Sequence, residues 1–132
     1  MMTLVPANAK QSKRGGEPFA SIGQGRISLS ATACRLIHDI YDFSYAEVYH
    51  GKENGKTISI VLNPCKEKRP EQNNIYGFTR RKYKGEIVEG LNINSKELIK
   101  EFFGTTKDSV STRYSVKKYD EGMLEIDITR EM

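Results

Sequence analysis

Residues 25–30 read Gly-Arg-Ile-Ser-Leu-Ser, and this stretch decides the fold predicted for the chain. From Arg26 to Leu29 polar and apolar side chains alternate, which is typical of a half-buried strand. Ser30 comes next and is a suitable N-cap, because its hydroxyl can accept a hydrogen bond from an unpaired amide in a first helical turn. We therefore expect a strand that runs directly into a short helix.

The segments on either side extend this junction to the order β-β-α-β-β. The glycines of Gly23-Gln24-Gly25 predict a tight reversal before it, and Asn54-Gly55 predicts a hairpin after it. Asn63-Pro64 is expected to end the last strand of this unit. The predicted strands are 18–23, 26–29, 45–49 and 56–62, and the predicted helix buries Ala33, Leu36, Ile37 and Ile40 at spacings of three and four.

The second half of the chain has the same order of elements. Asn94, with Glu97 three residues later, predicts a capped helix start, and Gly104 predicts its end. Matched apolar positions lie 64 residues apart at Ile27 and Leu91 and 66 apart at Ile58 and Leu124. The expected strands are 75–83, 86–93, 113–119 and 123–128, and the expected apolar helix face is Leu98, Ile99, Phe102 and Phe103.

These patterns predict an α+β, β-rich fold made of two tandem ββαββ units. The units span residues 19–63 and 75–129 and are joined by a polar linker at 64–74. Residues 1–16 have no apolar period and are expected to form a flexible arm. Residues 17–132 are expected to form a single domain, as befits a chain of 132 residues.

Gly25, Arg26, Ile27 and Leu29 resemble the strand-to-helix junction of the AbrB/MazE/SpoVT family of swapped-hairpin DNA-binding domains. Ser30 stands where that family usually has proline, and the second half, with Gly90-Leu91, matches only the layout. In that family two chains interleave their hairpins into one barrel and present basic residues to DNA. The resemblance implies that two tandem copies close a pseudo-twofold, swapped-hairpin-like barrel within one chain.

Composition narrows the class of protein further. The net charge is +4, 37% of residues are apolar, and the chain has only two cysteines. The longest mostly apolar stretch, 57–62, is far shorter than the roughly 20 residues of a bilayer span. Collagen-like, disulfide-scaffold and membrane classes are excluded. The apolar start precedes its basic residues, the reverse of a secretory signal, so a cytoplasmic location without membrane partners is expected.

Basic residues supply the candidate nucleic-acid site. Alternation places Arg80, Lys82 and Lys84 on one face of a strand and Arg81 on the other. Cations in such a row can bind successive phosphates with salt-dependent affinity. The same charges would also protect an exposed sheet edge, and this alternative stays open. The candidate residues are Arg26, Arg80, Arg81, Lys82, Lys84 and, in the arm, Lys13 and Arg14.

Few residues of the sequence support a metal site or a catalytic site. Cys34 and His38 have helical spacing, but a zinc site needs four converging ligands. Cys34 lies among apolar residues and is expected to be buried and unligated. The chain lacks a nucleophile elbow and a phosphate-binding Walker loop, so no metal, cofactor or enzymatic activity is expected.

Two functions are favoured over a third, an enzyme whose site assembles from residues that the sequence does not pair. The first is a small non-enzymatic DNA-binding protein, either a transcriptional regulator or a mobile-element accessory factor. The second is a protein-interaction module of the same fold, whose basic loops and tyrosines contact a protein partner without nucleic acid, for example a phage or mobile-element factor acting on a host protein. The sequence is compatible with a monomer or a homodimer.

Overall fold

The computed structural model describes residues 2–7 and 16–132. Eight strands form a closed antiparallel barrel in the order β1-β2-β6-β5-β3-β4-β8-β7, with two short α-helices. The β-rich class is confirmed, and each of the eight predicted strands is present. The strands are β1 (Phe19–Gly23), β2 (Arg26–Leu29), β3 (Tyr45–Glu53), β4 (Lys56–Cys65), β5 (Ile75–Tyr83), β6 (Glu86–Asn94), β7 (Thr112–Tyr119) and β8 (Met123–Asp127).

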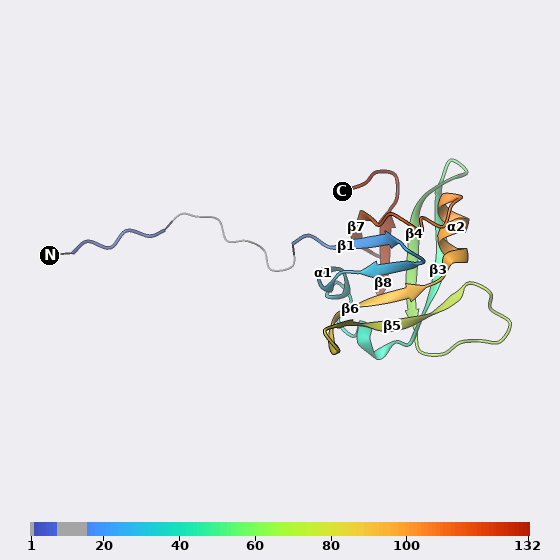
Figure 1. Cartoon of the computed structure of the whole chain (residues 1–132), viewed down its shortest axis with the longest axis horizontal. Coiled ribbons are helices and arrows are strands. Elements are labelled where there is room, and N and C mark those ends of the chain that lie inside the picture. Colours follow the sequence, from blue (N-terminus) through green and yellow to red (C-terminus); the bar gives the residue numbers. More distant parts are fainter. Residues whose placement is uncertain (1, 8–15) are drawn as a thin grey trace.

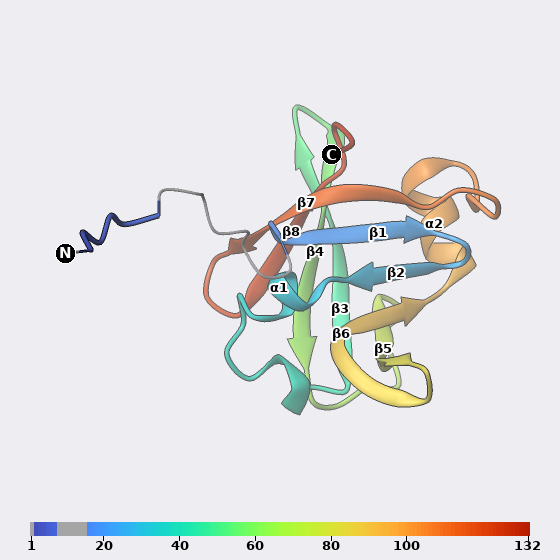
Figure 2. The ribbon, with the colours of Figure 1, turned by 60° about the vertical axis from the view of Figure 1, so that its left-hand side comes forward.

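Two kinds of strand pair close the barrel. Four pairs are hairpins of consecutive strands, β1·β2, β3·β4, β5·β6 and β7·β8. The other four, β1·β7, β2·β6, β3·β5 and β4·β8, each join a strand of the first half to one of the second. Figure 1 shows β1, β2, β6 and β5 side by side in front of the other strands, and Figure 2 shows the same layers after rotation. The two halves of the sequence are therefore held together by strand pairing throughout the barrel.

The core follows from the alternation of side chains in these strands. In the β2·β6 pair, Ile27 faces Ile93 and Leu29 faces Leu91. In the β4·β8 pair, Ile60 faces Ile126 and Leu62 faces Leu124, and all eight side chains are at most 2% exposed. Burying one such side chain contributes about 1.5–3 kcal/mol. The predicted apolar faces of these strands are thus the centre of the fold.

The first helix is shorter than predicted. Helix α1 spans Ala31–Cys34, and a separate 3₁₀ turn covers Ile40–Asp42. Ser30 is the N-cap, as predicted, and its Oγ accepts from the amide of Ala33 at 3.1 Å. After Cys34 the chain continues in tighter turns, with hydrogen bonds to the third residue back. These turns keep Ile37 and Ile40 buried, so the apolar spacing persists although the helix ends.

Two other boundaries also differ from prediction. Helix α2 spans Lys96–Phe103 and is capped by Ser95 rather than Asn94, with the Ser95 Oγ accepting from the amide of Leu98; Gly104 ends it as predicted. Strand β4 continues through Pro64 to Cys65. Near Pro64, β4 pairs only with β3, because its pairing with β8 ends at Leu62. Proline has no amide hydrogen to donate, so a strand tolerates it on a side where no partner strand would accept that hydrogen bond.

Among the described residues no helix has the length and apolarity to cross a membrane.

Candidate nucleic-acid interface

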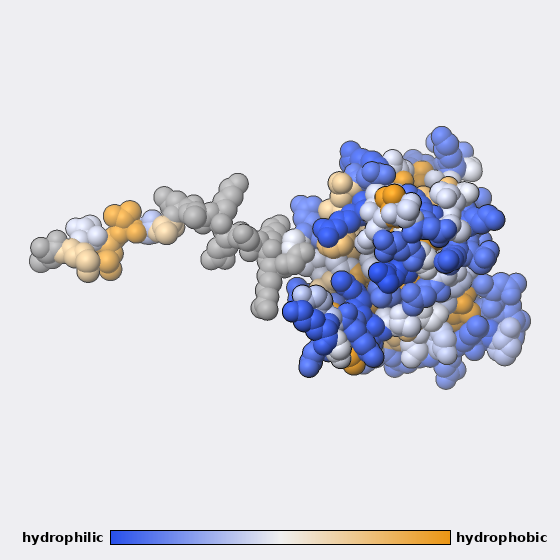
Figure 3. All heavy atoms as spheres, viewed as in Figure 1, coloured by the Kyte–Doolittle hydropathy of each residue, from blue (hydrophilic) through white to orange (hydrophobic). Residues whose placement is uncertain are grey.

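A hollow of about 190 Å³ on the outer surface gathers three arginines from three strands. Arg26 comes from β2, Arg81 from β5 and Arg113 from β7. We call this hollow the arginine pocket. Its lining residues are Phe19, Ser21, Arg26, Ser28, Arg81, Ser111 and Arg113. Figure 3, in the orientation that places β1 and β2 in front, shows a mostly hydrophilic surface.

The floor of the arginine pocket is a row of small polar residues across adjacent strands. Ser21 of β1 pairs with Ser28 of β2 on one side and with Arg113 of β7 on the other. The neighbouring residues Ile22 and Ile27 are buried in the core. Because side chains alternate along a strand, the two serines and the arginine point outward together. Serine hydroxyls at these positions leave a concave, hydrogen-bonding floor.

Arg81 reaches the pocket from the outer face of β5, across a glycine of β6. Thr79 of β5 faces Asn92 of β6, which faces Ser28 of β2, so alternation places Arg81, two residues after Thr79, on the same outer face as Ser28. The register shift between Arg80 and Lys82 puts its extra residues in β6. Gly90 of β6 has φ 119°, and a Cβ atom there would lie 2.4 Å from the Cδ of Arg81 and 2.9 Å from the carbonyl oxygen of Leu29. Only glycine leaves room for Arg81 to cross β6 at this backbone conformation.

The far wall of the arginine pocket is positioned by packing and by a second glycine. The guanidinium of Arg113 lies over the ring of Phe19, 4.3 Å from its centroid. This stacking restricts the guanidinium while its edge donors stay available. Gly23 allows the segment before β7 to approach β1, since a Cβ there would lie 2.0 Å from the carbonyl oxygen of Val110. That close approach brings Ser111 to the pocket.

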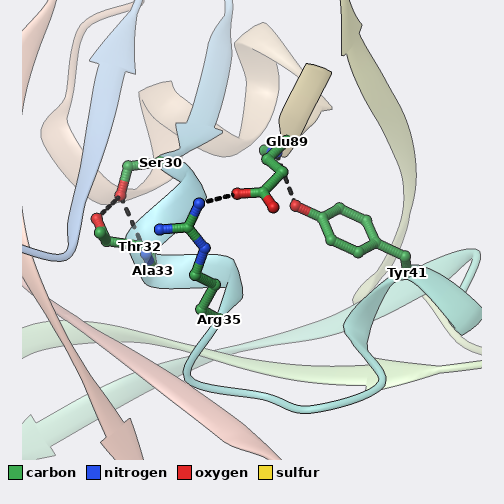
Figure 4. Close-up of polar contacts among 7 residues, drawn as sticks. Ser30, Thr32, Ala33, Arg35, Tyr41 and Glu89 are labelled. Atoms are coloured by element: carbon green, nitrogen blue, oxygen red, sulfur yellow. Dashed lines mark hydrogen bonds and ion pairs between the residues drawn. The ribbon is translucent and has the colours of Figure 1, made fainter. Parts of the chain in front are cut away.

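The arginine pocket is strongly cationic. None of the aspartates or glutamates in the described part of the chain lines it. The ion pairs within the described part of the chain lie elsewhere, at Arg35–Glu89, His50–Glu101 and Lys117–Glu125. Figure 4 shows the Arg35–Glu89 pair beside helix α1. Three guanidinium groups beside serine hydroxyls form a site suited to an oxyanion, because arginine donates paired hydrogen bonds to phosphate oxygens.

The predicted basic hairpin is only partly a continuous cationic row. Arg80 lies over the ring of Tyr41 at 4.2 Å, and the Tyr41 hydroxyl accepts from the amide of Gly90 at 2.8 Å (Figure 4). Lys82 is exposed, and Lys84 is a turn residue with φ 51°. That Arg80 and Lys82 share one strand face stays a prediction, since they lie two residues apart in β5, whereas Lys84 lies in the turn after that strand. All three are exposed residues of the same hairpin as Arg81.

Sequence reasoning found two of the three arginines and missed the third. Arg26 and Arg81 were candidates, and they meet in the arginine pocket. Arg113 was missed because its contribution depends on β1 pairing with β7, which sets it beside Ser21, 92 residues away in the sequence. The alternation of β7 alone would have placed Arg113 on the outer face. Lys13 and Arg14 lie outside the described residues.

Cys34 is 1% exposed and unpaired, which confirms its predicted burial. Burial raises the pKa of its thiol to about 11, partly offset by a hydrogen bond with Tyr41. Burial also raises the pKa of the Tyr41 hydroxyl, while the Gly90 amide opposes that shift. Residues 2–7 and 16–132 contain no group of three or more potential metal-ligating side chains. The Cys34 thiol is thus part of the core and lies next to Tyr41, whose hydroxyl accepts from the Gly90 amide.

Comparisons with known protein families, with curated proteins and with solved structures find no match for this chain.

Proposed function

We propose that this chain is a small non-enzymatic DNA-binding protein that contacts DNA mainly through phosphates. The observation that carries the proposal is the arginine pocket, in which Arg26, Arg81 and Arg113 line one hollow that has no carboxylate among its described lining residues. Arg80, Lys82 and Lys84 add positive charge along the adjoining hairpin. Phosphate contacts of this kind supply affinity with little sequence preference. A role as a transcriptional regulator or mobile-element accessory factor fits such a surface.

The proposal includes a pseudo-twofold, swapped-hairpin-like barrel similar to that of the AbrB/MazE/SpoVT family. The strand registers support it. An offset of 64 makes Asn92 the counterpart of Ser28, and these two residues face each other in the β2·β6 pair. An offset of 66 makes Ile126 the counterpart of Ile60, and these also face each other in β4·β8. Residues that face their own counterparts are expected on a twofold axis.

A salt titration of duplex DNA binding by fluorescence anisotropy tests the function. If three or four phosphates are neutralised, affinity falls roughly 40- to 150-fold between about 50 and 200 mM salt. The pocket variant R26Q/R81Q/R113Q is expected to bind weakly and with a flatter salt slope. The hairpin variant R80A/K82A/K84A is expected to flatten the slope while the protein remains folded, because these side chains are exposed.

The matched control is K56Q/K68Q/K118Q, which removes the same charge from three exposed positions outside both basic groups. Its affinity should change much less than that of the pocket variant. Circular dichroism checks that each variant is folded. Absence of DNA binding by the parent at low salt, or equal losses in the pocket variant and the control, would contradict the proposal.

A second candidate function is a protein-interaction module. One observation favours it: a hollow of about 410 Å³ on β3, β4, β7 and β8 is lined by Tyr49, Tyr119, Met123 and other residues. Tyr49 and Tyr119 are 41% and 48% exposed. Exposed tyrosines beside apolar surface are common at protein interfaces. Failure of DNA binding in the titration would favour this function.

A further inference from the structure

We propose that the arginine pocket is a site for a phosphate monoester, and that it binds a phosphorylated end of a nucleic acid in preference to an internal phosphodiester. The inference rests on the proposed function and narrows it, since it specifies which phosphate occupies the pocket. Three properties of the pocket support it: its charge, its donor set and its concave shape.

The charge of the pocket matches a dianion better than a monoanion. Arg26, Arg81 and Arg113 bring three guanidinium groups to one hollow, and within residues 2–7 and 16–132 no acidic side chain lines it. A phosphate monoester carries about −1.5 to −2 charges near neutral pH, whereas each internal phosphodiester carries one. Several converging cations stabilise the additional negative charge of a monoester. A row that offers one cation per phosphate stabilises that additional charge little.

The donors also exceed what a phosphodiester can use. A monoester has three terminal oxygens, and an internal phosphodiester has two. The arginine pocket offers three guanidinium forks together with the hydroxyls of Ser21, Ser28 and Ser111. Each fork donates several hydrogen bonds in a fixed plane. The third oxygen of a monoester therefore has partners here that an internal phosphate would leave unused.

The shape of the pocket favours a chain end. Its volume is about 190 Å³, and its lining comes from β1, β2, β5, β7 and the residue before β7. A terminal phosphate is bonded to one sugar, so only one sugar has to fit at the mouth of such a hollow. An internal phosphate is bonded to two sugars, and both must fit there. The walls are also held in place beforehand, because Arg113 stacks on Phe19 and Arg81 passes over Gly90. Preorganised donors lose less entropy on binding.

The test compares two duplexes of one sequence that differ only in a 5′-phosphate or a 5′-hydroxyl, with the fluorophore at a distant 3′ end. We expect the parent protein to bind the phosphorylated duplex about tenfold more tightly, the effect of roughly one further charge-assisted hydrogen bond. The pocket variant R26Q/R81Q/R113Q should lose this preference, and the control K56Q/K68Q/K118Q should retain it. Adenosine monophosphate should compete for the phosphorylated end, and adenosine should not.

The outcomes separate this inference from the proposed function. Equal binding of both duplexes, lost in the pocket variant, would overturn the preference for ends and leave DNA binding intact. Binding of adenosine monophosphate without binding of either duplex would support a monoester site for free nucleotides and contradict the DNA function. If the pocket variant still prefers the phosphorylated duplex, the phosphorylated end binds elsewhere, and the assignment of that end to the arginine pocket is overturned. Binding of neither ligand would overturn both.

Discussion

The reactivity of Cys34 is set by burial. Since the pKa of this thiol is raised from 9.0 to about 11, its thiolate fraction at pH 8 is roughly 100-fold below that of an ordinary thiol. In a C65S variant, which isolates Cys34, we expect native protein to react with a disulfide reagent at least about 100-fold more slowly than urea-unfolded protein. The raised pKa also stabilises the fold below pH 9, a contribution lost as pH rises toward 11. Equal rates in native and unfolded protein would contradict the buried position.

Single residues were predictable where their role depends on near neighbours in sequence. Ser30 caps α1 because its hydroxyl needs only the amide of Ala33, three residues later. Cys34 was assigned to the core from the apolar residues around it. Arg113 was not assigned to the site, because its partners Phe19 and Ser21 are brought to it by a strand pair that no local pattern encodes.

At the scale of the element, the β5–β6 hairpin depends on the crossing of Arg81 over Gly90. A G90A substitution places a Cβ 2.4 Å from the Arg81 Cδ and 2.9 Å from the Leu29 carbonyl, at a φ of 119°. We expect a loss of about 1–3 kcal/mol in the free energy of unfolding, measured in urea, together with weaker DNA binding. The control is G85A, which has φ 80° but no atom within 4 Å of the added Cβ. A G90A protein as stable as G85A would show that the crossing is not constrained.

The same hairpin shows why strands were easier to predict than surfaces. Alternation and turn residues located β5 and β6, but the register shift between these two strands leaves no mark in the pattern. The predicted length of helix α1 was wrong because apolar spacing fits both a helix and the tighter turns that follow Cys34. Local patterns thus predict that an element exists, and tertiary packing decides its length and which side chains of other elements it meets.

For the whole molecule, the pairing of strands predicts that neither half folds alone. Four of the eight strand pairs join the halves, and the two hairpins of each half do not pair with each other. Because isolated hairpins are at best marginally stable in water, we expect fragments 1–68 and 69–132 to be separately unfolded by circular dichroism. The cut falls between β4 and β5, so it interrupts no strand. Mixed in equal amounts, the fragments should form a one-to-one complex with the amide NMR spectrum of the intact chain. A fragment 1–68 that folds as a monomer, or a mixture that stays unfolded, would contradict this account of the barrel.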